Sequence, residues 1–79
     1  MLLARGSKGI EVKVIQEQLN QIGVTCDVDG DFGHGTEKAV KTFQTASGLP
    51  ADGIVGPNTR EKIDEALQQI INAGNQSST

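Results

Sequence analysis

The sequence predicts an all-α fold, a compact three-helix bundle with short loops. Three observations predict it. Apolar residues recur at helical spacing in three segments, a turn motif precedes the second and third segments, and 79 residues suffice for one domain. Cys26 is the only cysteine, which excludes an internal disulfide. Stability must therefore come from helix packing and turn chemistry.

The first helix is predicted to begin near Ser7 or Lys8 and to end at Ile22. Ser7 is a plausible N-cap residue, and Gly23 stands where a left-handed residue commonly ends a helix. One face of this helix carries an apolar stripe, made of Val12, Ile15, Leu19 and Ile22.

The second helix is predicted over residues 34–46. Its apolar face is Ala39, Val40 and Phe43, and Gly48 followed by Pro50 marks its end. Glu37 and Lys41 stand four residues apart, a spacing and orientation that slightly stabilises a helix.

The third helix is predicted from Pro57 to about Ala73, with Pro57 at the first helical position. Gly74 is expected to end it, so we assign residues 1–74 to the domain and residues 75–79 to a polar tail or the start of a linker. The predicted apolar stripe is Ile63, Leu67, Ile70 and Ile71.

An internal repeat is the most informative feature of the sequence. The pattern Asp-Gly-x-x-Gly-x-x-Thr begins at Asp29 and again at Asp52, 23 residues later, and each copy leads into a predicted helix. In each copy the Asp accepts backbone hydrogen bonds and the first Gly permits positive φ. One residue of each x-x pair is expected to point into the core. Two such turn–helix units should pack on the first helix.

These motifs resemble the peptidoglycan-binding domain family over nearly the whole chain. The chain departs from the usual family pattern at Val24 and Arg60, where an aromatic is common, and at His34, where Pro is common. The matching segments are 5–12, 15–20 and 22–23 at the start, 29–33, 36, 39–40, 43–44 and 48–49 in the centre, and 52–59 at the close.

The resemblance implies a non-catalytic module that binds glycan or stem peptide of the bacterial wall and targets a covalently linked lytic domain. An N-terminal module followed by a polar linker is similar to modular phage endolysins, although a bacterial origin stays open. The alternative is a protein–protein adaptor or prosegment-like module with the same fold. We expect a monomer, made in the cytoplasm without a signal peptide and active at the cell wall or in the periplasm.

The net charge and its distribution exclude some classes of binding partner. The net charge is −3, and residues 27–56 alone sum to −3, with no basic stripe. Nucleic acid and anionic membrane surfaces are therefore not expected as partners. One Cys and one His cannot form a structural zinc site, and no cofactor is expected.

Catalytic and metal-binding alternatives are weaker. The run from Asp27 to Asp31 is similar to a calcium loop, but Phe32 and Lys38 stand where an EF-hand needs Gly and Glu. His34 and Cys26 lack the neighbours that a general base or nucleophile needs. Asp29 and Asp52 are read as turn residues rather than a glycosidase pair. We therefore expect a binding module and not an enzyme.

The ligand site is expected in a shallow groove bordered by the two repeat turns. Four candidates have an equally good structural interpretation as turn caps, and Phe32 has one as a core residue. Asp31, His34 and Asn58 have no evident structural purpose and are the stronger candidates. The full set is Asp29, Asp31, Phe32, His34, Thr36, Asp52, Asn58 and Thr59.

Overall fold

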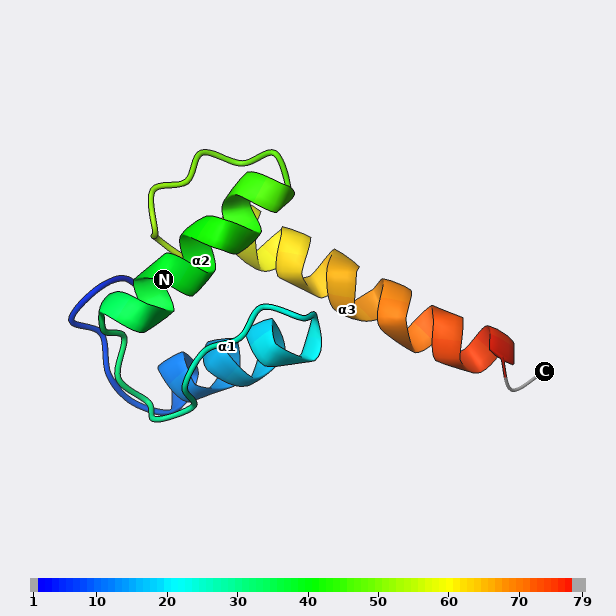
Figure 1. Ribbon diagram of the computed structural model, residues 1–79, viewed down its shortest axis with the longest axis horizontal. Coiled ribbons are helices and arrows are strands. Elements are labelled where there is room, and N and C mark those ends of the chain that lie inside the picture. Colours follow the sequence, from blue (N-terminus) through cyan, green and yellow to red (C-terminus); the bar gives the residue numbers. More distant parts are fainter. Residues whose placement is uncertain (1, 78–79) are drawn as a thin grey trace.

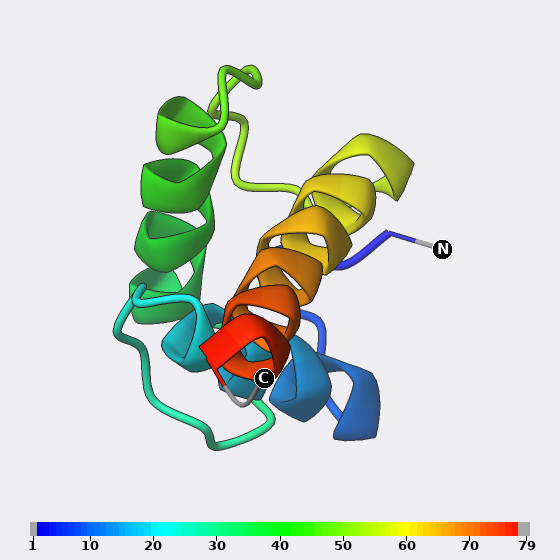
Figure 2. The ribbon, with the colours of Figure 1, turned by 90° about the vertical axis from the view of Figure 1, so that its right-hand side faces the viewer.

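The computed structural model describes residues 2–77, and the side chains of residues 2–70. It contains three helices, α1 (Ile10–Gln21), α2 (His34–Ala46) and α3 (Pro57–Ser77) (Figure 1). Helix α1 packs against both α2 and α3, and Figure 2 views the bundle from the C-terminal end of α3. Within residues 2–77 the extended backbone pairs only at two isolated bridges. The predicted all-α bundle is confirmed.

One core lies between the helices, and the repeat turns contribute to it. Phe32 and Val55 hold the same position in the two copies of the motif, and their side chains are 1% and 0% exposed. Their neighbours Asp31 and Ile54 face solvent. Burial of each large apolar side chain contributes about 1.5–3 kcal/mol to folding. The core residues are Leu3, Val12, Ile15, Leu19, Phe32, Ala39, Val40, Phe43, Val55 and Ile63.

Helix α1 begins later than the sequence suggests. Its N-cap is Gly9, with φ of 116°, and not Ser7. Ser7 instead accepts a hydrogen bond from the Ala4 N–H through its hydroxyl, at 3.2 Å. Backbone pairing between this segment and residues 30–32 holds it extended, a contact that local propensity does not reveal.

Helices α1 and α2 end in the same way, each on a glycine with positive φ. After α1, the N–H groups of Gly23 and Val24 donate to the carbonyls of Asn20 and Leu19. After α2, Gly48 and Leu49 donate to the carbonyls of Thr45 and Gln44. Both are Schellman motifs, which satisfy the last carbonyls of a helix. The ends predicted from Gly23 and Gly48 are thus found in the structure.

Helix α3 extends further than predicted. It continues through Gly74 to Ser77 and projects beyond the other two helices (Figure 1). Ile63 is buried, but Ile70 is 49% exposed since the core ends before it. The predicted stripe is therefore wrong at Ile70, and the side chain of Ile71 lies outside the described part. So do positions 78 and 79 of the predicted tail.

The residues before α1 form an N-terminal strap, residues 2–9, that touches both repeat turns. Leu3 and Val55 exchange two backbone hydrogen bonds, of 3.1 and 2.7 Å. Further along the strap, Gly6 donates to the Phe32 carbonyl, and Phe32 donates to the Ser7 carbonyl, at 3.0 and 2.9 Å. The strap thereby fixes the two turns relative to one another.

The strap yields a test of stability. Leu3 is 5% exposed and Leu2 is 60% exposed, so Leu3→Ala should lower the free energy of unfolding by about 2–4 kcal/mol through lost burial and a residual cavity. Leu2→Ala, the adjacent control, should change it by less than about 0.5 kcal/mol. Urea unfolding followed by circular dichroism measures both. Equal effects of the two variants would contradict the role given to the strap.

Candidate functional site

The first repeat turn is held by the buried side chain of Gln16, which projects from α1. Its Nε2 donates to Asp29 Oδ1, the Asp31 carbonyl and Thr36 Oγ1, at 3.0, 3.1 and 2.9 Å. Its Oε1 accepts from the N–H groups of Asp29 and Gly30 at 3.0 and 2.9 Å. Asp29 Oδ1 also accepts from the Asp31 N–H at 3.0 Å. One carboxamide therefore satisfies most polar groups of the turn.

The second repeat turn uses the same arrangement, with Gln44 of α2 in place of Gln16. Gln44 Nε2 donates to Asp52 Oδ1, the Ile54 carbonyl and Thr59 Oγ1, at 2.9, 3.0 and 3.1 Å. Its Oε1 accepts from the Gly53 N–H at 3.0 Å, and Asp52 Oδ1 accepts from the Ile54 N–H at 2.9 Å. Each helix thus anchors the turn that begins the next one.

The sequence analysis did not single out these two glutamines. Gln16 and Gln44 are 0% and 1% exposed, and each lies four residues after a core valine, Val12 or Val40, on the buried face of its helix. The sequence signal that could have indicated their burial is a polar residue at a position of the helix's apolar stripe. Among the described side chains, every fully buried nitrogen or oxygen has a hydrogen-bond partner, which is typical of a stable core.

Hydrogen bonding lowers the pKa of both turn aspartates. For Asp29 the main cause is the N–H of Asp31, followed by the amide of Gln16. For Asp52 the corresponding donors are Ile54 and Gln44. Donors stabilise the charged carboxylate, so the pKa falls. A glycosidase acid needs a raised pKa, and this pair has the opposite shift.

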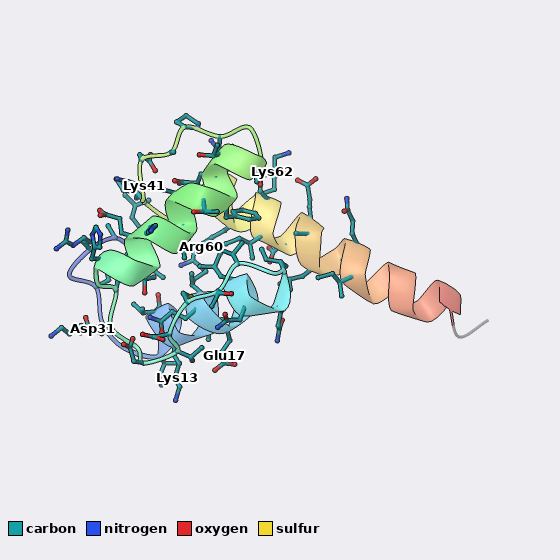
Figure 3. All side chains as sticks on the ribbon, in the orientation of Figure 1. Lys13, Glu17, Asp31, Lys41, Arg60 and Lys62 are labelled. Atoms are coloured by element: carbon teal, nitrogen blue, oxygen red, sulfur yellow. The ribbon has the colours of Figure 1, made fainter. Side chains whose placement is uncertain are left out.

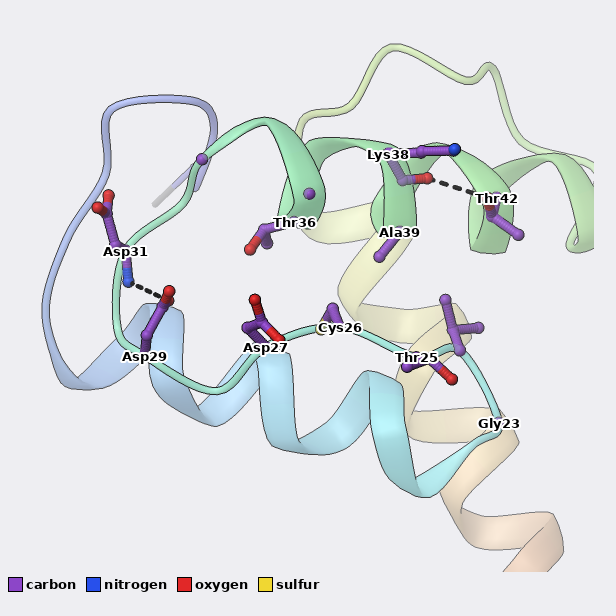
Figure 4. A pocket seen from close by; sticks show the side chains of 13 residues that line it. Gly23, Thr25, Cys26, Asp27, Asp29, Asp31, Thr36, Lys38, Ala39 and Thr42 are labelled. Carbon is purple, nitrogen blue, oxygen red and sulfur yellow. Dashed lines mark hydrogen bonds between the residues drawn. The ribbon is translucent and has the colours of Figure 1, made fainter.

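A groove of about 550 Å³ lies between the loop after α1 and the first three turns of α2. In Figure 4, Asp27 and Asp31 rise from the loop, Thr36 and Ala39 face the loop from α2, and the Lys38 side chain runs along the outer side of the helix. We call it the α2 groove. It is lined by Gly23, Val24, Thr25, Cys26, Asp27, Asp29, Asp31, Gly33, Gly35, Thr36, Lys38, Ala39 and Thr42.

The second turn borders a smaller hollow of about 160 Å³ beside the start of α3, which we call the α3 groove. It is lined by Gln44, Leu49, Pro50, Asp52, Ile54, Gly56, Pro57, Asn58 and Thr59. The eight candidate residues are thus divided. The α2 groove contains Asp29, Asp31 and Thr36, whereas the α3 groove contains Asp52, Asn58 and Thr59. The two turns line separate hollows and not the shared groove that the sequence suggested.

The remaining candidates lie elsewhere. Phe32 is a core residue, 1% exposed. His34 is the first residue of α2, with its side chain 79% exposed, and it lines neither groove. Its Nδ1 lies 4.0 Å from Glu37 Oε1, and the same oxygen lies 3.7 Å from Arg5 Nη1. These are exposed surface contacts, worth little to stability.

Cys26 is half-buried at the edge of the α2 groove. Its thiol donates to the Gln16 carbonyl, with a sulfur–oxygen distance of 3.6 Å. Burial raises the pKa of the thiol, and the charges of Asp27 and Asp29 raise it further. A raised pKa keeps the group protonated at neutral pH, which makes it a poor nucleophile.

In the described residues, His, Cys, Asp and Glu nowhere gather in threes in a way that would hold a metal ion. No helix in the same part of the chain combines the length and the apolar character that crossing a bilayer requires.

Two solved structures share the fold and much of the sequence. The SleB N-terminal domain matches with a TM-score of 0.79 and 39% identity, over 84% of this chain and 92% of that one. The Burkholderia AP3 phage endolysin matches with a TM-score of 0.78 and 40% identity, over 80% of this chain and 24% of the endolysin.

The fold and its matches define a small, non-catalytic helical binding module. The family model for a peptidoglycan binding domain matches residues 8–63, and the chain belongs to that family. A spore cortex-lytic enzyme from Bacillus cereus is 35% identical over 79 residues, which cover 99% of this chain and 30% of that enzyme. The chain therefore spans about a third of the relative's length.

The glutamine network can be tested by removing only its polarity. Gln16→Met keeps the length of the side chain but leaves the Asp29 and Gly30 N–H groups and the Thr36 hydroxyl without their partner. An unsatisfied buried polar group costs about 1–3 kcal/mol, so we expect a loss of about 2–4 kcal/mol in the free energy of unfolding. Gln21→Met, at an exposed position of the same helix, is the control. A Gln16→Met protein as stable as this control would refute the anchoring role.

The turn aspartates predict how stability depends on pH. Their pKa values are lowered from 3.8 in the folded state, so their stabilising effect is complete above about pH 5 and is lost as pH falls through the folded-state values. In the double variant Asp29→Asn/Asp52→Asn, the amide oxygen still accepts hydrogen bonds but does not titrate. Its thermal midpoint should fall less than that of the unchanged chain between about pH 5 and pH 2. Parallel curves for the two proteins would contradict the assignment.

Proposed function

We propose that this chain binds bacterial peptidoglycan and directs a covalently attached lytic enzyme to the wall. The family match over residues 8–63 is the observation that carries this proposal. It is supported by relatives in which the same module is a fraction of a longer protein, such as the spore cortex-lytic enzyme. The likeness to a phage endolysin supports a more specific form, in which the attached lytic domain is that of an endolysin; in this form we place the module before the lytic domain.

The α2 groove has suitable chemistry for such a ligand. Peptidoglycan presents hydroxyls, N-acetyl groups, amides, carboxylates and, where stem peptides are not cross-linked, amines. The exposed carboxylates of Asp27 and Asp31 can accept hydrogen bonds from hydroxyl or ammonium groups, and the exposed Lys38 ammonium can pair with a carboxylate. The first N–H groups of α2 have no acceptor within the helix, and Gly35 and Thr36, which carry two of them, line the groove.

The proposed site is centred on Asp31, together with Asp27 and Lys38, which the sequence analysis did not include. Asp29, Thr36, Asp52 and Thr59 use their side chains to hold the turns, and in the proposal they shape the site from within. Asn58 belongs to the α3 groove, and His34 to the neighbouring surface. We assign these two a secondary, peripheral contact with the wall.

Weak individual contacts suffice for this function. A linked lytic domain is kept at high effective concentration near a polymer with many equivalent sites, so the module needs no tight single-site affinity. A monomeric module in a longer chain meets this requirement.

The proposal predicts that the chain sediments with purified peptidoglycan sacculi and not with cellulose. The variant Asp27→Asn/Asp31→Asn/Lys38→Gln should bind about tenfold more weakly, because it loses charge-assisted hydrogen bonds worth about 1.5 kcal/mol or more. Its thermal midpoint should change little, since these side chains are exposed. The measurement is the bound fraction against sacculus concentration.

The matched control is Lys13→Gln/Glu17→Gln/Asp64→Asn, which changes the same kinds of charge elsewhere. Lys13 and Glu17 extend from the side of α1 that faces away from α2 (Figure 3), and Asp64 is exposed on α3. This control should bind like the unchanged chain. Failure of the unchanged chain to sediment would refute the proposed function, and equal loss in both variants would remove the α2 groove from it.

A further inference from the structure

Most glycines in residues 2–70 are explained by backbone conformation, packing or helix capping, so a glycine without such an explanation is informative. Residues 2–70 contain nine glycines, and six of them have positive φ, which residues with side chains rarely adopt. Gly56 has negative φ, but a Cβ there would lie 3.0 Å from Leu2 Cδ2. Gly33 is the N-cap of α2, a position that suits glycine. Among the nine glycines of residues 2–70, only Gly35 remains without such a reason.

Gly35 lies in the first turn of α2, a helical position at which glycine is not required. Inside a helix, glycine is about 1 kcal/mol less favourable than alanine. A Cβ at Gly35 would meet nothing within 4 Å, so neither packing nor conformation requires its absence. Gly35 does line the α2 groove, and a bare backbone beside a groove permits close approach by a ligand.

The second repeat provides an internal comparison. Gly35 is the second residue of α2, and Asn58 is the second residue of α3, each one position before the anchored Thr. The residue after the Asp-Gly pair is Asp31 in the first repeat and Ile54 in the second. The α3 groove, beside Asn58 and Ile54, has a volume of about 160 Å³, whereas the α2 groove, beside Gly35 and Asp31, has a volume of about 550 Å³. Asn is thus compatible with this turn–helix corner but accompanies a smaller groove.

Aromatic side chains are absent from the surface. The chain has two Phe and no Trp or Tyr, and Phe32 and Phe43 are only 1% and 6% exposed. A sugar ring binds well when its apolar C–H face packs on an exposed aromatic ring, and this chain offers none. The α2 groove instead combines the exposed carboxylates of Asp27 and Asp31, the ammonium of Lys38 and backbone N–H groups. This combination suits a peptide with amide, carboxylate and amine groups.

We propose that the α2 groove binds the stem peptide of peptidoglycan rather than its glycan, with the peptide main chain lying against the bare backbone at Gly35. This inference rests on the proposed function and specifies its ligand. Gly35 is then a specificity-determining residue, because any side chain there would occupy the space that the peptide main chain needs.

The experiment compares the unchanged chain with Gly35→Asn, which places in the first repeat the residue found in the second. Ala46→Asn, at an exposed position at the far end of α2, is the control. The probes are intact sacculi, sacculi stripped of stem peptides by an amidase, and the free stem tetrapeptide. Binding is measured by co-sedimentation for the sacculi and by NMR chemical-shift titration for the tetrapeptide.

We expect the unchanged chain to bind intact sacculi and the tetrapeptide, and to lose at least nine-tenths of its binding to stripped sacculi. Gly35→Asn should bind at least tenfold more weakly than Ala46→Asn, with a thermal midpoint equal to or above that of the unchanged chain. Undiminished binding to stripped sacculi, or a Gly35→Asn variant that binds normally, would overturn this inference and leave the proposed function intact. Failure to bind intact sacculi would overturn both.

Discussion

Two buried carboxamides determine how this small bundle closes. A turn built on Asp-Gly exposes several N–H and carbonyl groups, and burying them without partners would cost more than a thin core can offset. Gln16 and Gln44 each supply a donor and an acceptor to the turn ahead of them. Phe32 and Val55 can be buried in the core only because the polar groups of their turns have hydrogen-bond partners. The same unit, used twice, produces most of the tertiary structure.

Local features of the sequence predicted most of the fold. The bounds of α2 and the start of α3 follow from nearby residues, because glycine and proline punctuate both helices. The start of α1 does not, since it depends on pairing with residues 30–32, more than 20 positions away. The two glutamines were also missed, because the importance of a polar helical residue depends on what its buried end meets. Their place beside Val12 and Val40 was the only local sign.

The sequence predicted which turn residues lie near the candidate site, but it did not predict the shape of the grooves. The repeated motif identified the residues at the two turns. The motif repeats because each glutamine needs an Asp and a Thr as hydrogen-bond partners, and these bonds occupy the side chains of Asp29, Thr36, Asp52 and Thr59 inside the protein. The open space depends on the residues that differ between the repeats, such as Gly35 and Asn58. Pattern matching emphasises what the copies share, whereas ligand recognition, as proposed, relies on the positions where they diverge.

The strap also has a consequence for how the chain folds. Each glutamine meets its turn within 20 residues along the chain, so both corners can form through short, rapidly closed loops. Leu3 and Val55 are 52 positions apart, so their pairing closes a longer loop, which forms more slowly. We therefore expect this end of the strap to pair after the two corners have formed, and on the ribosome it cannot pair until Val55 has been made.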